Sequence, residues 1–281
     1  MTLSQSLLAS LPEILERIRN TDRILLALDF DGTLAAIADR PEHAAMPEET
    51  AAILRELSDS ERLSLVILSG RSIADLKAKV DLDCIRVGNH GLEIEGAGIS
   101  FVHEGARALL PAVDFACWDL EAAMEGVRGV FVERKGLTAT VHYRQAPADL
   151  GMWIETTVRL TMHPYDSLLG LKPARKAWEI RPRVDWDKGS ALKYVLNRIG
   201  ATHPLLICAG DDTTDEDVFA AFEDAISIQV GGQSRTAARF RVNGPAQLAA
   251  FLRELRPAIG RQTAPSPPSG VASDGAPILK R

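Results

Sequence analysis

The sequence of 281 residues has few cysteines and no long apolar run. Its three cysteines, Cys84, Cys117 and Cys208, are odd in number and widely separated, so they predict neither a disulfide framework nor a metal-ligand cluster. We expect buried thiols in a reducing compartment. No segment approaches the roughly 20 apolar residues that span a bilayer, and the N-terminus lacks the basic start and apolar stretch of a signal peptide. These absences predict a cytoplasmic protein with no membrane partner.

Basic charge is also scarce. There are 32 lysines and arginines against 38 acidic residues, which gives a net charge of −6. A general nucleic-acid binder would present a basic face, so the balance argues against a nucleic-acid partner. Hydrophobic residues make up 46% and charged residues 25% of the chain, which is enough apolar material to bury a sizeable core.

Buried strands alternate with helices near both ends of the chain. Apolar runs at 24–28, 63–68 and 205–209 predict strands that are buried on both faces, and the helical patterns between strands favour a parallel sheet. From about 105 to 184 the pattern changes to helix, hairpin, helix, hairpin. The predicted fold class is therefore α/β, a Rossmann-like parallel sheet with an inserted α+β cap.

The insert lies between Ser69 and Lys188, in the second insertion position, because only 38 positions lead from Asp31 to Ser69, whereas 119 lead from Ser69 to Lys188. The end of the chain is rich in Pro, Ser and Gly without apolar periodicity, which predicts disorder. The predicted division is a discontinuous core of 1–104 and 185–255, a cap of 105–184 and a disordered tail of 256–281.

Three predicted strands end at short polar clusters, which are Asp29-Phe30-Asp31-Gly32-Thr33, Ser69-Gly70 and 210–216. In open α/β sheets, ligands bind at the carboxyl ends of the strands, so we expect these clusters to converge. Crowded carboxylates repel one another unless a cation lies between them, and oxygen-only ligands suit a hard ion. The sequence therefore predicts a Mg²⁺ site rather than a zinc site.

The same clusters favour phosphoryl transfer. Lys188 would add a fixed cation to the metal, and Ser69 with helix N-terminal amides would donate hydrogen bonds to phosphate. The spacing of Asp29 and Asp31 puts two carboxylates beside one bound group, where one can attack phosphorus while the other protonates the leaving oxygen. Each residue alone also suits a helix cap or a solvated surface, but their order at successive strand ends favours the chemistry.

These segments, Asp29-Phe30-Asp31-Gly32-Thr33-Leu34, Ser69, Lys188 and Gly210-Asp211-Asp212, resemble the four motifs of the haloacid-dehalogenase-like phosphatase superfamily, in order. The resemblance implies that Asp29 is the nucleophile that forms an aspartyl-phosphate and that Asp31 is the general acid and then the base. It also implies roles for the remaining motif residues: Ser69 and Lys188 hold phosphate, Asp29, Asp31 and Asp211 bind Mg²⁺, and Asp212 and Asp215 lie behind these ligands.

The first cap hairpin has one polar face. With a turn at Lys135-Gly136, Glu133 would lie opposite Thr138, and alternation would place Glu133, Thr138, Thr140, His142 and Arg144 on one face. Such a face can simply be solvated. We instead expect it to face the phosphate site, because carboxylates such as Glu133 and Glu179 accept paired hydrogen bonds from sugar hydroxyls.

Motifs of core and cap together resemble the trehalose-6-phosphate phosphatase family: Ser69-Gly70-Arg71, Gly88-Asn89-His90-Gly91-Leu92-Glu93, Val141-His142-Tyr143-Arg144, Glu179-Ile180-Arg181-Pro182, Trp186-Asp187-Lys188-Gly189 and 210–216. The resemblance implies hydrolysis of trehalose 6-phosphate to trehalose and phosphate, the last step of trehalose biosynthesis, with functional coupling to a separate trehalose-6-phosphate synthase. Substrate recognition would fall on Arg71, His90, Glu133, Lys135, His142, Arg144 and Glu179.

Three other functions stay open at this point. The substrate could be another sugar phosphate. A phosphomannomutase-like isomerase would need cap arginines that bind a second phosphate, for which Arg144, Arg175 and Arg181 are candidates, although Glu133 and Glu179 argue against it. A non-catalytic phosphate-sensing module would gain nothing from a nucleophile beside an acid, so the carboxylate pair favours an enzyme.

Overall fold

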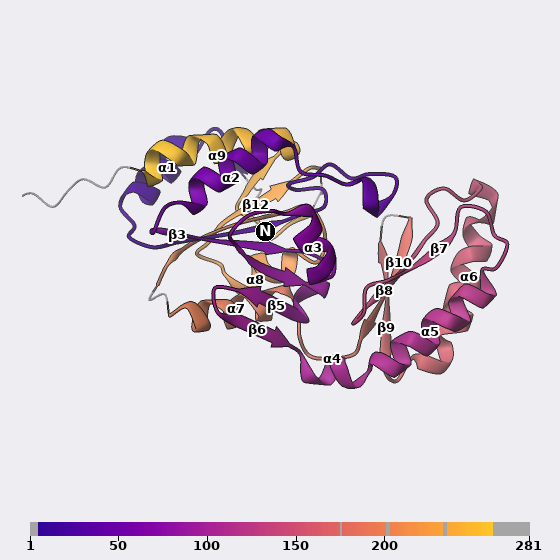
Figure 1. The fold of residues 1–281 in the computed structure, drawn as a ribbon. Coiled ribbons are helices and arrows are strands. Elements are labelled where there is room, and N and C mark those ends of the chain that lie inside the picture. Colours follow the sequence, from indigo (N-terminus) through magenta and orange to yellow (C-terminus); the bar gives the residue numbers. More distant parts are fainter. Residues whose placement is uncertain (1–4, 175, 201–202, 233–234, 261–281) are drawn as a thin grey trace, which may run out of the picture.

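Two separate sheets organise the computed structural model, which describes residues 5–174, 176–200, 203–232 and 235–260 (Figure 1). The larger sheet has the strand order β1-β13-β12-β11-β2-β3-β4-β5-β6. Its strands are β1 (Gln5–Ser6), β2 (Ile24–Asp29), β3 (Leu63–Leu68), β4 (Ile85–Gly88), β5 (Glu93–Gly96), β6 (Ile99–Val102), β11 (Leu205–Gly210), β12 (Ile226–Val230) and β13 (Phe240–Val242).

The strands from β1 to β4 in this order pair in parallel, and β5 and β6 extend one edge in antiparallel fashion. Every residue of the central strands β2 and β11 is buried, as the apolar runs predict. The α/β fold class is thus confirmed. The antiparallel edge is not part of the sequence prediction; it turns at Gly96-Ala97-Gly98, where all three residues have positive φ.

Helices cover both faces of the larger sheet. The helices α1 (Leu11–Arg19), α2 (Glu48–Ser58) and α9 (Pro245–Ile259) share one apolar core, and α7 (Lys188–Ile199) with α8 (Glu216–Ala221) contributes to the other. The expected tail start at residue 256 is wrong, because α9 continues to Ile259 and buries Ala258 and Ile259. The rest of the predicted tail, 261–281, lies outside the described residues.

The smaller sheet has the order β7-β8-β10-β9 and is antiparallel throughout. Its strands are β7 (Phe131–Arg134), β8 (Ala139–His142), β9 (Leu169–Ala174) and β10 (Ala177–Pro182). Two helices, α5 (Leu110–Ala123) and α6 (Gly151–Met162), pack on one face through a separate apolar core. We call this sheet with its two helices the cap. The predicted order of helix, hairpin, helix and hairpin is confirmed.

Shorter elements connect these parts: α3 (Ile73–Lys79), α4 (Glu104–Ala108), and the 3₁₀ helices η1 (Pro41–His43), η2 (Asn89–Gly91), η3 (Ala148–Leu150) and η4 (His163–Tyr165). The helix η3 directly precedes α6, which begins at Gly151. The chain passes between core and cap twice, and an aromatic cluster lies at these crossings. Phe101 lies 5.4 Å from Trp186 and 4.6 Å from Tyr194, measured between ring centroids, and His103 lies 5.3 Å from Trp186.

The first cap hairpin differs from the sequence prediction in register. Glu133 lies opposite Thr140 rather than Thr138, and the Lys135 amide donates to the Thr138 carbonyl at 2.9 Å. The turn is therefore centred on Gly136-Leu137, where Leu137 is buried against the core. Because the partner shifts by two residues, the same side chains stay on the same face, and the predicted polar face survives.

The cysteines and the helix lengths agree with the composition of the chain. Cys84, Cys117 and Cys208 are free and buried, which confirms that they are buried thiols. Within the described ranges, each helix is too short or too polar to cross a membrane.

Candidate active site

The predicted polar clusters meet at the carboxyl edge of the larger sheet. Asp29 ends β2, Ser69 follows β3 and Asp211 follows β11, and these three strands are neighbours in the sheet. Their side chains line one cavity of about 690 Å³, together with Asp31 and Lys188. The structure thus brings together residues that are up to 182 positions apart in the chain, as expected for adjacent parallel strands.

Lys188 is the charged centre of this cavity floor. Its side chain is only 2% exposed, and its ammonium donates hydrogen bonds of 2.7 Å to Asp29 Oδ1 and 2.7 Å to Asp215 Oδ1. Burial by itself lowers the pKa of Lys188, but the two carboxylates outweigh this effect and raise it. The ammonium is therefore a permanent cation, held at the first turn of α7 whose N-terminus Asp187 caps.

Three carboxylates lie around one point beside Lys188. Asp29, Asp211 and Asp215 each offer an oxygen, and these oxygens all lie within 4.8 Å of one another. Gly32 permits this approach, since a Cβ built on its backbone would lie 2.0 Å from Asp211 Oδ2, and its φ of +82° suits glycine.

The electrostatics of this cluster fit a divalent cation. Burial raises the pKa of Asp29, Lys188 lowers it, and the neighbouring Asp215 and Asp211 raise it further. Burial and the repulsion of Asp215 and Asp212 raise the pKa of Asp211 to about 7. Such crowded carboxylates remain ionised together only when positive charge is added, and an all-oxygen donor set is the one that Mg²⁺ prefers.

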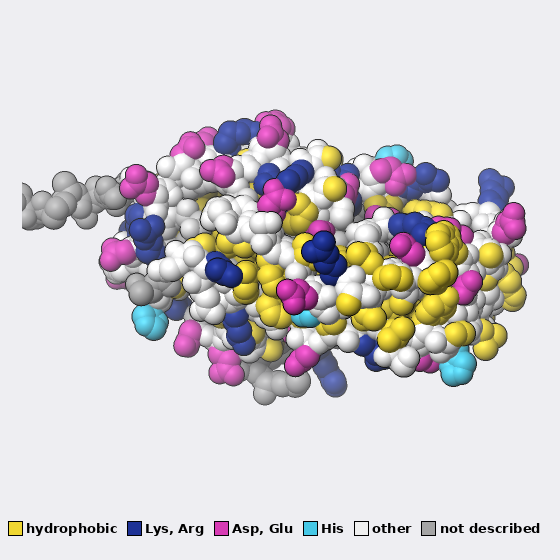
Figure 2. Space-filling view, turned by 60° about the horizontal axis from the view of Figure 1, so that its bottom comes forward, with side chains coloured by type: hydrophobic (Ala, Val, Ile, Leu, Met, Phe, Trp, Pro, Cys, Tyr) yellow, Lys and Arg dark blue, Asp and Glu magenta, His cyan; other side chains and the backbone are white. Residues whose placement is uncertain are grey.

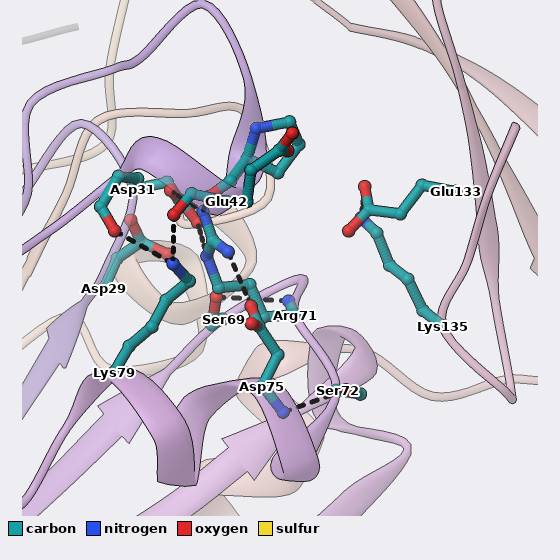
Figure 3. A network of polar contacts seen from close by, with 12 residues as sticks. Asp29, Asp31, Glu42, Ser69, Arg71, Ser72, Asp75, Lys79, Glu133 and Lys135 are labelled. Atoms are coloured by element: carbon teal, nitrogen blue, oxygen red, sulfur yellow. Dashed lines mark hydrogen bonds and ion pairs between the residues drawn. The ribbon is translucent and has the colours of Figure 1, made fainter. Parts of the chain in front are cut away.

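The Asp31 carboxylate lies outside the cluster of Asp29, Asp211 and Asp215. Both of its oxygens accept hydrogen bonds from Arg71, at 2.6 and 2.7 Å (Figure 3). Asp215, predicted to lie behind the metal ligands, is instead a member of the carboxylate cluster. The Asp212 carboxylate accepts a 2.7 Å hydrogen bond from the Thr213 amide and so supports the loop after β11.

Ser69 lies at the cavity wall next to these groups. It is 1% exposed, and its hydroxyl oxygen accepts a hydrogen bond from the Arg71 amide at 3.1 Å. The Ser69 amide donates to the Val87 carbonyl and its own carbonyl accepts from the His90 amide, which fixes the residue between β3 and η2. The hydroxyl hydrogen therefore remains available for a group in the cavity.

The polar face of the cap forms the opposite wall of the cavity. Glu133, Lys135, His142, Arg144 and Glu179 all line it, and Figure 3 shows Glu133 and Lys135 across the gap from the core residues. Glu133 Oε2 lies 2.7 Å from His142 Nε2 and 3.7 Å from Lys135 Nζ. Burial raises the pKa of Glu133, but His142 and Lys135 outweigh that effect and lower it. This wall therefore presents an ionised carboxylate to a ligand.

His90 and Glu179 join core and cap within the same wall. His90 Nε2 lies 3.4 Å from Glu179 Oε1, and Arg181 pairs with the other Glu179 oxygen. Burial lowers the pKa of His90 to about 3, although Glu179 acts in the opposite direction, so the imidazole is neutral. Burial would raise the pKa of Glu179, but its contacts with His90, Arg181 and Lys135 hold it well below the usual range. Gly70 leaves room for the His90 ring, which a Cβ would meet at 2.4 Å.

Several cavity residues are absent from the sequence prediction. The backbone segment 36–39 with Pro41 and Ala44 lines the mouth, and Gly231 and Gly232 follow β12. The two glycines could have been found, because they also stand at the carboxyl end of a strand. Asn89 lies outside the lining of this cavity but supports it: its amide donates to the Lys135 carbonyl at 3.0 Å and its oxygen accepts from Thr138, which holds the cap hairpin on the core. A contact between residues 46 positions apart leaves no local pattern in the sequence by which it could be predicted.

Comparison with known families agrees with this geometry. A family model described as trehalose-phosphatase matches residues 27–246, which include core and cap. This chain belongs to the trehalose-phosphatase family. It is 34% identical over 263 residues to a trehalose-phosphate phosphatase of Mycobacterium marinum, a match that covers 88% of this chain and 66% of that protein. The chain thus spans about two thirds of that relative, and it spans 19% of a longer Mycobacterium tuberculosis relative described as an uncharacterized glycosyl hydrolase.

Solved structures of the trehalose-phosphatase type share the fold. A trehalose-6-phosphate phosphatase related protein superposes with a TM-score of 0.72 at 25% identity, covering 83% of this chain and 96% of the other. The C-terminal domain of the Candida albicans trehalose-6-phosphate phosphatase gives 0.76 at 22% identity, covering 91% and 98%. Both matches extend over core and cap, so the predicted combination of a parallel sheet with a separate antiparallel unit is a family property.

Proposed function

We propose that this chain is a Mg²⁺-dependent phosphatase that hydrolyses trehalose 6-phosphate to trehalose and phosphate. One observation supports it above the others: Asp29, Asp211, Asp215 and Lys188 form the floor of a cavity whose opposite wall is the polar cap face. The floor suits a phosphate with its counter-ion, and the wall suits sugar hydroxyls. The family membership gives the substrate class, and the cavity of about 690 Å³ is within the usual size range for small-molecule sites.

The reaction proceeds in two displacements. An Asp29 carboxylate oxygen forms a bond to phosphorus, the bond from phosphorus to the sugar oxygen breaks, and that oxygen takes a proton from the carboxyl of Asp31. A water oxygen then forms a bond to phosphorus and gives one proton to Asp31, and the bond from phosphorus to Asp29 breaks. One ester and one water become one alcohol and one phosphate, and both aspartates return to their starting states.

The chain's other residues hold the reacting groups. Lys188 fixes Asp29 and adds positive charge beside the phosphate, and the Ser69 hydroxyl donates to a phosphate oxygen. Asp29, Asp211 and Asp215 would hold Mg²⁺, which supplies charge neutralisation to the phosphate oxygens when bound. Positioning of this kind is worth about 7–11 kcal/mol of the barrier, which matters because phosphate monoester hydrolysis is very slow without a catalyst.

The cap wall would choose the sugar and exclude water. Glu133 and Glu179 accept hydrogen bonds from hydroxyls, while Lys135, His142 and Arg144 donate to them. Two acidic groups in this wall disfavour a second phosphate, which an isomerase of the phosphomannomutase type must bind there. Of the arginines that would serve such an isomerase, Arg181 is paired with Glu179 and Arg144 bonds the Ala38 carbonyl, while Arg175 lies outside the described residues.

The deciding experiment is phosphate release by the purified chain from trehalose 6-phosphate with Mg²⁺, beside a panel of other sugar phosphates. We expect the highest kcat/KM for trehalose 6-phosphate and loss of turnover in Asp29→Asn. The proposal fails if trehalose 6-phosphate yields no phosphate, and formation of mannose 1-phosphate from the 6-phosphate would establish the isomerase instead. Cytoplasmic location and coupling to a separate trehalose-6-phosphate synthase belong to the same proposal.

A further inference from the structure

Arg71 is buried in the core wall, and its hydrogen bonds go to the protein itself. The side chain is 5% exposed. Its Nε donates to Asp31 Oδ2 at 2.6 Å and its Nη2 donates to Asp31 Oδ1 at 2.7 Å, while Nη1 donates to Asp75 at 2.5 Å and Nη2 also donates to the Pro41 carbonyl at 2.9 Å. A guanidinium has five N–H donors, and four are used here. Arg71 thus lines the cavity, but four of its five donors are taken up by the protein itself.

The pair of Arg71 with Asp31 joins a buried side chain to a more exposed one. The Asp31 side chain is 40% exposed, eight times the fraction of its partner. Arg71 also lies with its guanidinium carbon 5.3 Å from the centre of the Phe30 ring, which adds a second restraint on its plane. A two-point hydrogen bond fixes the direction of a carboxylate as well as its distance. Arg71 therefore holds the Asp31 carboxylate in one direction at the edge of the cavity that both residues line.

The surroundings of Arg71 reach the cap. Lys79, four residues after Asp75 on α3, donates to the carbonyls of Glu42 and Ala44 at 3.0 Å each, and Figure 3 shows these groups around Arg71. The segment 36–44 is thereby pinned to α3. The same segment accepts a hydrogen bond from the cap, because Arg144 donates to the Ala38 carbonyl. Arg71 therefore contacts both Asp31 and the segment 36–44, and this segment in turn contacts the cap.

We propose that Arg71 is a positioning residue that acts through Asp31 and does not bind the substrate; the proposal rests on the phosphatase function given above. The guanidinium donates to both oxygens of the Asp31 carboxylate and so fixes the direction in which that carboxylate faces the reacting groups. Without Arg71, the Asp31 side chain would be free to rotate, and it would spend less time aligned with the leaving oxygen or the attacking water.

A double-mutant cycle on kcat tests this coupling. We expect Asp31→Asn to lower kcat by about 10²–10⁴-fold, the usual range for loss of a general acid and base. Arg71→Ala should lower kcat by roughly tenfold to a hundredfold with little change in KM, because the ion pair orients a group used in the same step. The double variant should equal Asp31→Asn alone. A double variant that loses the product of both single effects, or an Arg71→Ala variant with raised KM and unchanged kcat, would make Arg71 a substrate ligand and overturn the proposal.

Two further measurements separate positioning from mere stability. Arg71→Lys keeps the charge but loses the two-point bond, so it should retain the KM of the wild type and only part of its kcat. With p-nitrophenyl phosphate, whose leaving group needs little protonation, the defect of Arg71→Ala should shrink; equal losses on both esters would contradict the proposal. The matched control is Arg134→Ala on the outer face of the cap, which pairs with Glu121 and does not line the cavity.

The activity of the wild type on the panel of esters tests the proposed function independently of the double-mutant cycle. If the wild type fails on trehalose 6-phosphate but hydrolyses another ester of the panel, the function proposal falls, and the cycle is measured on that ester. If the wild type hydrolyses none of the esters, both proposals fall.

Discussion

The Lys188 ammonium lies 2.7 Å from Asp29 and 2.7 Å from Asp215, so one buried cation separates the carboxylate that ends β2 from the carboxylate that precedes α8. A single cation faces a cluster of three carboxylates within the described site. The imbalance leaves room for one more positive charge, and the stability of the protein should therefore respond to divalent ions.

Mg²⁺ should stabilise the fold through this cluster. We expect thermal unfolding to shift upward with added Mg²⁺, by the equivalent of about 2.7 kcal/mol at a concentration 100 times Kd, and to return with a chelator. Asp211→Asn should show a smaller shift. In the absence of metal, the same variant should unfold at a higher temperature than the wild type, because it removes one of the mutually repelling carboxylates. An unfolding temperature of the wild type that does not change with Mg²⁺ would contradict the assignment of the carboxylate cluster as a Mg²⁺ site.

Lys188→Met should impair both folding and catalysis. Removal of one partner from a buried ion pair costs about 3–5 kcal/mol, so the free energy of unfolding should fall by that order in denaturant titrations. Turnover should drop by about 10²–10³-fold, because charge stabilisation beside the phosphate is lost. Lys193→Met on the exposed face of the same helix is the control and should change neither quantity appreciably. An unchanged free energy of unfolding in Lys188→Met would show that the ion pairs of Lys188 with Asp29 and Asp215 do not stabilise the fold.

The His90 site predicts a loss of stability in mild acid. Burial lowers the pKa of this ring to about 3, whereas an unfolded histidine titrates near pH 6.5. As the pH falls below 6.5, His90 binds a proton in the unfolded chain but stays neutral in the folded chain. The free energy of unfolding should therefore decrease by about 2 kcal/mol between pH 7 and pH 5. Lys188, with its pKa raised, remains charged throughout this range, and Glu179, with its pKa held low, remains ionised in the folded state.

His90→Gln should remove this part of the pH dependence. The free energy of unfolding, measured in denaturant at several pH values, should then vary less between pH 7 and pH 5 than in the wild type. His163→Gln, at an exposed position of the cap, provides the control and should keep the wild-type slope. If both variants have identical slopes, His90 is not the group that titrates.

Glu133→Gln tests the role of the cap wall in substrate choice. Hydrogen bonds to charged groups are worth about 1.5–3 kcal/mol, so we expect KM for trehalose 6-phosphate to rise by roughly tenfold to a hundredfold. Turnover of p-nitrophenyl phosphate, which has no sugar hydroxyls, should stay near the wild-type value. Glu121→Gln, which lies on the outer face of α5 and away from the cavity, should affect neither substrate. Equal losses on both substrates would place Glu133 outside sugar recognition.

The strand-end argument predicted most of the core site from the sequence. Asp29, Ser69 and Asp211 each follow an apolar run, and parallel neighbours must end at the same edge. The partner of Asp31 could not be predicted in this way, because the Arg71 contact depends on side-chain rotamers across two strand ends. The polar hairpin face was predicted correctly despite the wrong partner for Glu133, since alternation fixes faces and the turn fixes register.

Other parts needed the folded context. The short strands β5 and β6 lack the long apolar run that marks a central strand, and β13 has only three residues. The end of α9 was placed too early, because composition changes at Arg256 while Ala258 and Ile259 still find a core to pack against. Asn89 contacts the cap hairpin 46 residues away, and such a pairing follows from tertiary packing alone.

The stacked rings of Phe101, His103, Trp186 and Tyr194 have a mechanical consequence. Both polypeptide segments that enter and leave the cap meet at this stack, so it is the natural hinge for any rotation of the cap. Such a rotation would carry Glu133 and Lys135 together and would have to break the polar contacts that join cap and core elsewhere, from Asn89 to the cap hairpin and from Arg144 to the Ala38 carbonyl. Asp29, which ends a core strand, would stay in place.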